Sequence, residues 1–182
     1  MMNIVSSKHS FFSRGFTLME LLVVIAILGI LATIGLGAFA SSQTKSRDSR
    51  RKTDLKNIAV ALETYYNDNA AYPVSAAGKI VGCAAAACEW GSEWKTGTTI
   101  YMATLPIDKT AYNYYYYSDG SRYVLYARLE NSNDLQAAKT SEGAPGEYGG
   151  SVCADGVKCN FAITSTNSPA PTVTGVGEED AF

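Results

Sequence analysis

The chain has 182 residues, 47% of them apolar, and its 15 basic and 17 acidic side chains leave a formal net charge of −2. This length and apolar content predict a folded protein of about one domain and exclude a disordered or collagen-like chain. The absence of a basic excess argues against a dedicated nucleic-acid-binding protein. Many of the apolar residues are concentrated near the N-terminus, where the sequence is most informative.

Residues 16–40 form a long apolar run that contains one charged residue, Glu20, and no proline. A membrane-spanning helix needs about 20 such residues, so the run is long enough to cross a bilayer. A secretory signal peptide has a shorter apolar stretch that ends at a small-residue cleavage site. We therefore expect a transmembrane helix that the mature protein keeps, preceded by the polar residues 1–15 with Lys8 and Arg14.

The junction between these two segments carries a specific motif. Gly15 is followed by Phe16, and Glu20 lies five residues after the glycine, just before the sequence Leu-Leu-Val-Val-Ile-Ala-Ile-Leu. This combination resembles the class III signal of type IV prepilins and pseudopilins. The resemblance covers residues 14 to about 40 and implies that a prepilin peptidase cuts after Gly15 and methylates the new N-terminal amine of Phe16. Residues 1–15 would then be a cleaved leader peptide.

Glu20 has two possible roles, which can coexist. A charge at the bilayer centre costs about 2.5–3.5 kcal/mol on insertion scales, so an ionisable residue here is a functional candidate. Thr17 and Glu20 have the spacing of a capping box, in which Glu20 closes the first turn of its own helix. Cleavage after Gly15 would also create a positive amine on Phe16. Glu20 could neutralise that amine on a neighbouring subunit and set the stagger between subunits, and the resemblance favours this assembly role.

The resemblance also implies a location. It places the leader inside the cell and the rest outside, first as a single-pass precursor in the inner (cytoplasmic) membrane, in contact with lipid, and then in an extracellular filament. The positive-inside rule would instead place the denser basic cluster of residues 45–56 in the cytoplasm. We follow the resemblance, because the cysteines and tyrosines downstream are typical of an extracellular head. The basic residues 45–52 are expected to form a solvated helix face, with lipid head groups or a neighbour's acidic surface as the alternative.

The helix is expected to continue to residue 69. Residues 41–53 are polar but contain no proline or glycine, and the apolar residues that follow recur at spacings of three and four. This amphipathic stripe consists of Leu55, Ile58, Ala59, Leu62, Tyr65 and Tyr66. The predicted helix over 16–69 is roughly 80 Å long and has an assembly half (16–40) and an amphipathic half (41–69). Gly29, Thr33 and Gly37 form a small-xxx-small row that favours close helix packing, although glycine is also common in membrane helices.

Residues 70–164 are expected to form a β-rich head. Residues 70–97 read as irregular, whereas Tyr112–Tyr117 and Arg122–Glu130 flank Asp119-Gly120 as in a β-hairpin. A further strand near 158–164 would complete a small antiparallel sheet. The alternating residues Tyr123, Leu125, Ala127 and Leu129 are the natural face to pack on the helix stripe. The expected fold class is therefore α+β, a pilin fold with a long N-terminal helix on a small antiparallel sheet. Residues 165–182 are expected to be a flexible tail, with O-glycosylation or docking on the head as the alternatives.

The head contains the four cysteines of the chain. Compact zinc sites favour Cys-x2-Cys pairs, and loss of the leader would remove the only histidine, His9, so we expect no metal site and no cofactor. Because the resemblance implies a head outside the cytoplasm, we expect disulfides. Three connectivities are possible, and the expected one joins sequence neighbours. Its pairs are Cys83–Cys88 and Cys153–Cys159.

The resemblance bears on these features as well. Pilin heads commonly carry a disulfide-bounded loop near the C-terminus, which Cys153–Cys159 would represent. Major pseudopilins of type II secretion usually lack cysteines and carry a calcium site. Residues 131–134 and 178–180 match such a site only loosely.

The functional expectation is structural. The mature chain would have no histidine, glycine-rich phosphate loop or obvious nucleophile–base pair, so we expect no enzymatic activity. The leading hypothesis is a type IV pilus subunit that polymerises with itself through the N-terminal helix on a pilus or secretion assembly platform, for adhesion, motility or DNA uptake. The first alternative is a pseudopilin of a type II secretion or competence system. A further alternative is a monomeric membrane-anchored extracellular binding protein. Nucleic acid is not expected as a primary partner.

Overall fold

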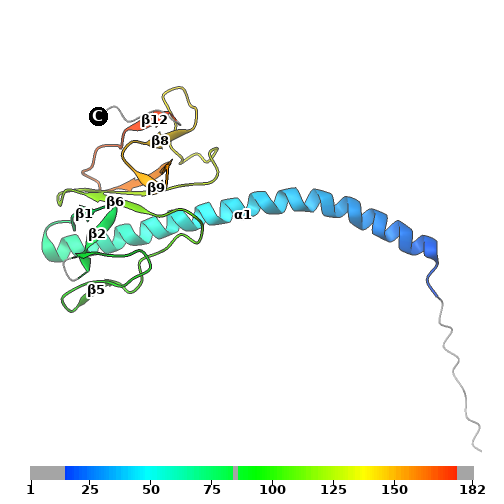
Figure 1. The fold of residues 1–182 in the computed structure, drawn as a ribbon, viewed down its shortest axis with the longest axis horizontal. Helices are drawn as coiled ribbons and strands as arrows, with labels where there is room; N and C mark the ends of the chain where they lie inside the picture. The colour runs from blue at the N-terminus through cyan, green and yellow to red at the C-terminus, as the bar shows by residue number, and fades with distance from the viewer. Residues whose placement is uncertain (1–14, 84–85, 176–182) are drawn as a thin grey trace, which may run out of the picture. The chain divides into compact units, whose positions relative to one another are not determined.

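The computed structural model describes residues 15–83 and 86–175, with the backbone alone at residues 34–38 and 175. The chain divides into two compact units between Ser42 and Gln43. A single helix, α1 (Leu18–Asn69), supplies the described helical part of the first unit and the first element of the second (Figure 1). All described strands lie in the second unit, and we call the described residues after α1, 70–83 and 86–175, the head.

The helix ends where the sequence predicts. Its last residue is Asn69, and Ala70 adopts a positive φ of 56° while its backbone N–H still donates to the Tyr66 carbonyl oxygen at 2.8 Å. A left-handed residue at this position is the usual way to end a helix, although the residue is more often glycine. Pro73 then prevents any continuation of the helix.

The core of the head is built on the predicted stripe of α1. Leu55, Ile58 and Leu62 are completely buried. They belong to one cluster with apolar and aromatic residues from the strands, among them Trp94, Tyr116, Tyr123, Leu125, Ala127 and Leu129. The predicted packing of the helix stripe on the alternating strand face is thus confirmed, except at Tyr66, which is 40% exposed. Because a small antiparallel sheet is marginal alone, the helix supplies the second layer that its core requires.

The central sheet has the order β11-β7-β6 and is antiparallel throughout. Its strands are β6 (Tyr115–Ser118), β7 (Tyr123–Ala127) and β11 (Phe161–Thr164). The predicted hairpin and the predicted third strand are therefore present. At the hairpin turn the Asp119 carboxylate accepts hydrogen bonds from the Ser121 hydroxyl at 2.7 Å and the Ser121 N–H at 3.0 Å, which lower the pKa of Asp119 to about 2. Gly120 supplies the positive φ of 92° that this turn requires.

The segment predicted to be irregular, residues 70–97, is instead organised by short strands. The strands β1 (Ser75–Ala76), β2 (Lys79–Cys83) and β3 (Ala86–Ala87) form one antiparallel sheet. The strands β4 (Trp94–Thr96) and β5 (Thr99–Met102) form a hairpin. These strands are two to five residues long, too short for an alternating pattern to stand out in the sequence.

The C-terminal part of the head adds two further strand pairs. They are β9 (Val152–Ala154) with β10 (Val157–Lys158), and β8 (Gly146–Tyr148) with β12 (Val173–Gly175). The prediction of a flexible tail over 165–182 is therefore wrong for residues 165–175, because the edge of β8 offers backbone partners that composition does not reveal. Residues 176–182 lie outside the described part of the chain. The α+β class and the helix-on-sheet arrangement are confirmed.

Candidate assembly site

The first part of α1 is apolar on every side and uncovered. From Leu18 to Leu31 all large apolar side chains are exposed, from 45% at Val23 to 87% at Leu18. Leucine, isoleucine, valine and alanine without proline form a regular helix, so the local sequence explains the secondary structure. It does not explain what covers the surface, because an uninterrupted apolar surface of this kind in water is strongly unfavourable. This part of the helix therefore requires an apolar environment outside its own chain.

The helix begins with the capping box that the sequence predicts. The Glu20 carboxylate oxygen Oε2 accepts hydrogen bonds from the Thr17 N–H and the Thr17 hydroxyl, both at 2.9 Å. In return the Glu20 N–H donates to the Thr17 hydroxyl oxygen at 3.2 Å. Such a reciprocal pair satisfies N–H groups that the first turn of a helix leaves unpaired. The capping role of Glu20 is thus present in the single chain.

The expected processing site lies immediately before this cap. Gly15 and Phe16 are exposed and precede the helix, and the Phe16 side chain is 83% exposed. A side chain added at Gly15 would meet no neighbouring atom within 4 Å. The peptide bond between them is therefore accessible from the Gly15 side. The leader residues 1–14 lie outside the described part of the chain, so cleavage after Gly15 and methylation of Phe16 stay predictions.

The small-xxx-small row of Gly29, Thr33 and Gly37 is described at the first two positions and by its backbone alone at the third. No neighbour lies within 4 Å of a side chain added at Gly29, and the Thr33 hydroxyl donates to the Ile30 carbonyl oxygen at 2.7 Å. The third member, Gly37, has only a described backbone, which is helical. Within the part of the chain that the structure describes, no helix is both long and apolar enough to cross a membrane. The transmembrane half expected over 16–40 therefore stays a prediction.

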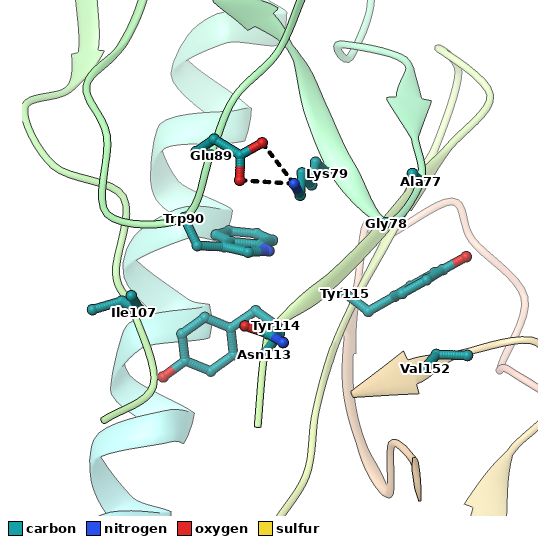
Figure 2. Close-up of a pocket in the computed structure, with 10 residues that line it drawn as sticks. All are labelled: Ala77, Gly78, Lys79, Glu89, Trp90, Ile107, Asn113, Tyr114, Tyr115 and Val152. Carbon is teal, nitrogen blue, oxygen red and sulfur yellow. Dashed lines mark hydrogen bonds and ion pairs between the residues drawn. The ribbon is translucent and has the colours of Figure 1, made fainter. Parts of the chain in front are cut away.

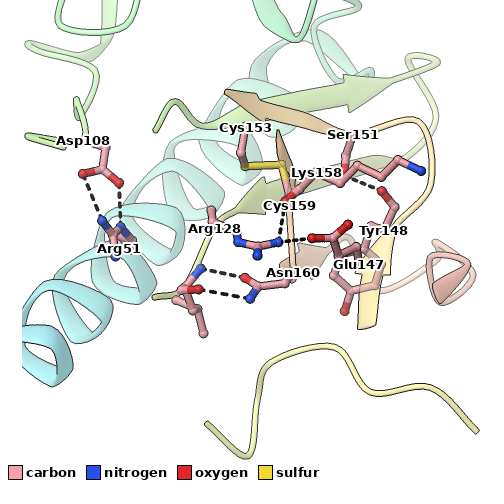
Figure 3. The surroundings of a disulfide bond; sticks show 11 residues. Arg51, Asp108, Arg128, Glu147, Tyr148, Ser151, Cys153, Lys158, Cys159 and Asn160 are labelled. Atoms are coloured by element: carbon pink, nitrogen blue, oxygen red, sulfur yellow. Dashed lines mark hydrogen bonds and ion pairs between the residues drawn. A yellow bond between two sulfur atoms is a disulfide. The ribbon is translucent and has the colours of Figure 1, made fainter. Parts of the chain in front are cut away.

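The basic residues 45–52 form the expected solvated face only in part: Lys45 and Arg50 are exposed, whereas Arg51 is buried. The Arg51 side chain is only 2% exposed and forms ion pairs with three carboxylates. Its nitrogen atoms lie 2.6 Å from Asp48 Oδ1, 2.5 Å from Asp108 Oδ2 and 2.8 Å from Glu130 Oε1. Figure 3 shows the contact of Arg51 with Asp108. This surface of the helix binds acidic residues of its own head, and the prediction of a solvated face is wrong for Arg51.

The charged side chains around Arg51 also pair with backbone N–H groups of the loop after β7. Asp48 accepts hydrogen bonds from the N–H groups of Glu130 and Asn131, each at 2.9 Å. Arg47 donates to both carboxylate oxygens of Glu130, at 2.8 and 2.5 Å. Nearby, Lys52 Nζ lies 2.6 Å from Asp134 Oδ1. These contacts fix α1 to the loop that follows β7, and we call Arg47, Asp48, Arg51, Asp108 and Glu130 the charged cluster.

Electrostatics favour the charged forms of Arg51 and Glu130. Burial disfavours the Arg51 cation, but hydrogen bonds to Asp108 and Glu130 outweigh it, so the pKa of Arg51 is raised. Hydrogen bonds from Arg47 and Arg51 lower the pKa of Glu130 to about 2. These partners could not be predicted from local patterns, because Asp108 and Glu130 lie 57 and 79 positions from Arg51. Only the fold brings them together.

The cysteines pair as expected. The Sγ–Sγ distances are 2.08 Å for Cys83–Cys88 and 2.14 Å for Cys153–Cys159. Cys153 of β9 and Cys159, which follows β10, are completely buried (Figure 3), and they belong to one apolar cluster with Val124 and Tyr126 of the central sheet. Next to them Arg128 forms an ion pair with Glu147 and donates to the Lys158 carbonyl oxygen at 2.9 Å. Both disulfides belong to apolar clusters of the head.

The described residues contain no group of three histidine, cysteine, aspartate or glutamate side chains placed to hold a metal ion. In the loosely cation-like segment 131–134, Asp134 is engaged by Lys52 and by the Gln136 N–H at 2.9 Å. The other such segment, 178–180, lies outside the described residues.

A capped apolar N-terminal helix, followed by an antiparallel head that packs on the later part of the same helix, is the architecture of type IV pilins and pseudopilins. Two family matches agree with it. Residues 12–36 match the prokaryotic N-terminal methylation motif, and residues 38–151 match the family described as type II secretion system (T2SS), protein G. The chain belongs to this protein G family, within the type IV pilin and pseudopilin class.

Individual relatives support both branches of the class. The chain is 34% identical over 110 residues to the type II secretion system core protein G of Pseudomonas aeruginosa, covering 59% of this chain and 75% of that protein. It is 31% identical over 108 residues to the core protein G of Vibrio cholerae, covering 59% and 73%. The type IV major pilin protein PilA of Myxococcus xanthus is 42% identical over 60 residues, which span 33% of this chain and only 27% of that pilin. No solved structure matches the chain.

Proposed function

We propose that the chain is a structural subunit that polymerises through the exposed apolar part of α1 after a prepilin peptidase removes residues 1–15 and methylates Phe16. The observation that supports this most is that the surface is exposed along its whole length: every large apolar side chain from Leu18 to Leu31 is at least 45% exposed. Copies of the same helix would cover it, and the membrane lipid would cover it before assembly. The proposed role is structural and not enzymatic.

The geometry at the helix start supports a charge pair between subunits. Both hydrogen bonds that Glu20 accepts from Thr17 go to the same oxygen, Oε2. Capping therefore does not require Oε1, which we propose faces the methylated Phe16 amine of a neighbouring subunit. In an apolar bundle the two charges would neutralise each other, and an unpaired charge there is costly. Glu20 would thus cap its own helix and set the stagger between subunits.

A type IV pilus is the leading form of this filament, and the second candidate is a pseudopilus of a type II secretion system. The identity with a type IV major pilin over the N-terminal region is compatible with the first candidate, and the match of residues 38–151 to protein G supports the second equally. In both, the precursor would enter the inner membrane once, and an assembly platform would extract it into the filament.

The decisive test is the Glu20→Ala variant of the full chain, expressed in its host. The variant should be processed normally, with mass spectrometry showing a methylated Phe16 at the N-terminus, but its filament yield should fall about tenfold or more because a buried amine loses its partner. Thr17→Ala is the matched control, because it removes the cap at a cost of about 1 kcal/mol yet keeps the carboxylate.

Three outcomes would contradict the proposal. The first is a protein that keeps its leader in the cell, and the second is a normal filament yield from Glu20→Ala. The third is a loss of filament yield in Thr17→Ala equal to the loss in Glu20→Ala. Electron microscopy of material sheared from the cell surface then separates the two candidate filaments. Surface fibres that contain this chain at normal expression support a pilus. Loss of protein secretion without loss of surface fibres in a deletion strain supports a pseudopilus.

A further inference from the structure

The head contains a pocket of about 430 Å³ that has no part in the assembly site (Figure 2). It opens between the start of β2, the segment that follows β3 and the beginning of β6. Its size lies within the range of about 300–1,000 Å³ that is common for small-ligand sites. Its lining combines aromatic, aliphatic and hydrogen-bonding side chains, which include Lys79, Glu89, Trp90, Asn113, Tyr115 and Val152.

Two aromatic rings stand on opposite sides of the pocket, Trp90 and Tyr115 (Figure 2). The Trp90 ring is held edge-to-face on Tyr114 at 5.8 Å and 85°, and the Tyr114 hydroxyl donates to Asp54 of α1 at 2.8 Å. Each wall is therefore supported by the core or the helix, and a ligand would not have to order it. Such preorganisation lowers the entropic cost of binding.

The second wall of the pocket is the Tyr115 ring, and its position is fixed by the backbone at Gly78. A side chain on Gly78 would come within 2.5 Å of the Tyr115 ring, so only glycine permits the close approach of β2 to this ring. Gly78 also has a φ of 75°, which glycine adopts readily. On its other side Tyr115 contacts Tyr126 edge-to-face at 6.0 Å. The Tyr115 ring is thus held in one position at the side of the pocket.

The polar groups of the pocket carry no net charge. Lys79 Nζ lies 2.6 and 2.7 Å from the two carboxylate oxygens of Glu89, and the pair lies at the pocket wall (Figure 2). Asn113 adds an amide that can both donate and accept hydrogen bonds. A phosphate, sulfate or carboxylate ligand would meet a cation that is already neutralised. The site therefore favours a neutral ligand that can accept from Lys79 and donate to Glu89.

We propose that this pocket binds a neutral carbohydrate. The faces of a pyranose ring present C–H groups that pack well on electron-rich aromatic rings such as those of Trp90 and Tyr115. Its hydroxyl groups each donate and accept, which matches Lys79, Glu89 and Asn113. The pocket would hold one or two sugar units of a surface polysaccharide or glycan chain. This binding activity goes beyond polymerisation and uses none of the residues of the assembly site.

The test uses the full chain in a detergent without a sugar head group, such as lauryldimethylamine oxide. Maltohexaose, cellohexaose, xylohexaose and N-acetylglucosamine hexamer are the neutral probes, and polygalacturonate is the charged one. Isothermal titration calorimetry, a readout that does not depend on the tryptophans that the variants change, should show saturable binding of at least one neutral probe. Trp90→Ala should weaken it about tenfold or more, because it removes one stacking surface.

Two further variants guard against misfolding, because Trp90 also packs against the core. Val152 is 53% exposed at the pocket, so Val152→Trp should fill the site and block binding without disturbing the core. Tyr117→Ala is the matched control, since Tyr117 is a 50% exposed tyrosine of the same hairpin outside the pocket, and it should bind as the unmodified chain does. The proposal is overturned if no neutral probe saturates, if only the charged probe binds, or if Val152→Trp and Tyr117→Ala bind alike.

Discussion

The two parts of α1 use the same kind of residue for different purposes. Between Leu55 and Leu62 the large apolar side chains of one face, Leu55, Ile58 and Leu62, are completely buried, whereas Val60 on another face is 69% exposed. Between Leu18 and Leu31 they occur on every face and are exposed. An amphipathic stripe indicates burial within the chain, whereas an all-apolar helix requires other molecules around it. The distribution of apolar residues around the helix, more than their number, thus separates folding from assembly.

Among substitutions in the part of α1 that packs on the head, Arg51→Ala is expected to change the free energy of unfolding most. The change leaves the buried carboxylates of Asp48 and Asp108, which are 3% and 6% exposed, without their shared cation. Removal of one partner of a buried ion pair costs about 3–5 kcal/mol, so the free energy of unfolding of the head should fall by this amount. Urea unfolding of the full chain in detergent, followed by tryptophan fluorescence, measures it. Arg50→Ala, at a side chain 60% exposed, should change it by less than about 0.5 kcal/mol.

The next effect tests the two parts of the helix directly. Leu62→Ala removes a completely buried side chain and should destabilise the head by about 2–5 kcal/mol. Leu28→Ala, at a side chain 58% exposed in the single chain, should leave the unfolding free energy unchanged and lower the filament yield instead. Measurement of both the unfolding free energy and the filament yield for both variants would show that each variant changes only one of the two quantities. A loss of head stability from Leu28→Ala would mean that the apolar part also serves the fold of its own chain.

The smallest effect concerns pH. Hydrogen bonds from Arg47 and Arg51 lower the pKa of Glu130 from 4.5 to about 2, so its ionised form stabilises the folded head. This contribution is fully present above pH of about 4.5 and is lost as the pH falls towards 2. We expect a decrease of about 1–2 kcal/mol in the unfolding free energy, because Glu130 is 21% exposed and solvent screens the pair. Unfolding at pH 6, 4 and 2 measures it, and in Glu130→Gln this part of the pH dependence should disappear.

Local patterns predicted a large part of this molecule. The stripe from Leu55 to Leu62 and the alternation from Tyr123 to Ala127 identified the two faces that form the core, because both periods are properties of the local chain. The Thr17–Glu20 spacing likewise predicted a cap that depends on one turn of helix. The neighbouring cysteines formed the pairs that sequence proximity favours.

What could not be predicted depends on distant partners. Arg51 looked like one of several solvated basic residues, because nothing near it in the sequence shows that Asp108 and Glu130 will surround it. The pairing of β12 with β8 was hidden in the same way, since a short strand at an edge is stabilised by its neighbour and not by its own composition. The sugar-sized pocket combines Lys79, Trp90 and Asn113, which only the folded head brings together.

The position of the charged cluster has a mechanical consequence. Helix α1 continues without interruption from the apolar part into the head, and Arg47 and Arg51 are among the first of its side chains to bind the head. Tension applied along the helix axis would therefore reach these ion pairs early, several of them in parallel. Bonds that share a load in shear yield together and at higher force than bonds opened one after another. The charged cluster would thus be the set of contacts that keeps each head attached to its helix when the filament is under tension.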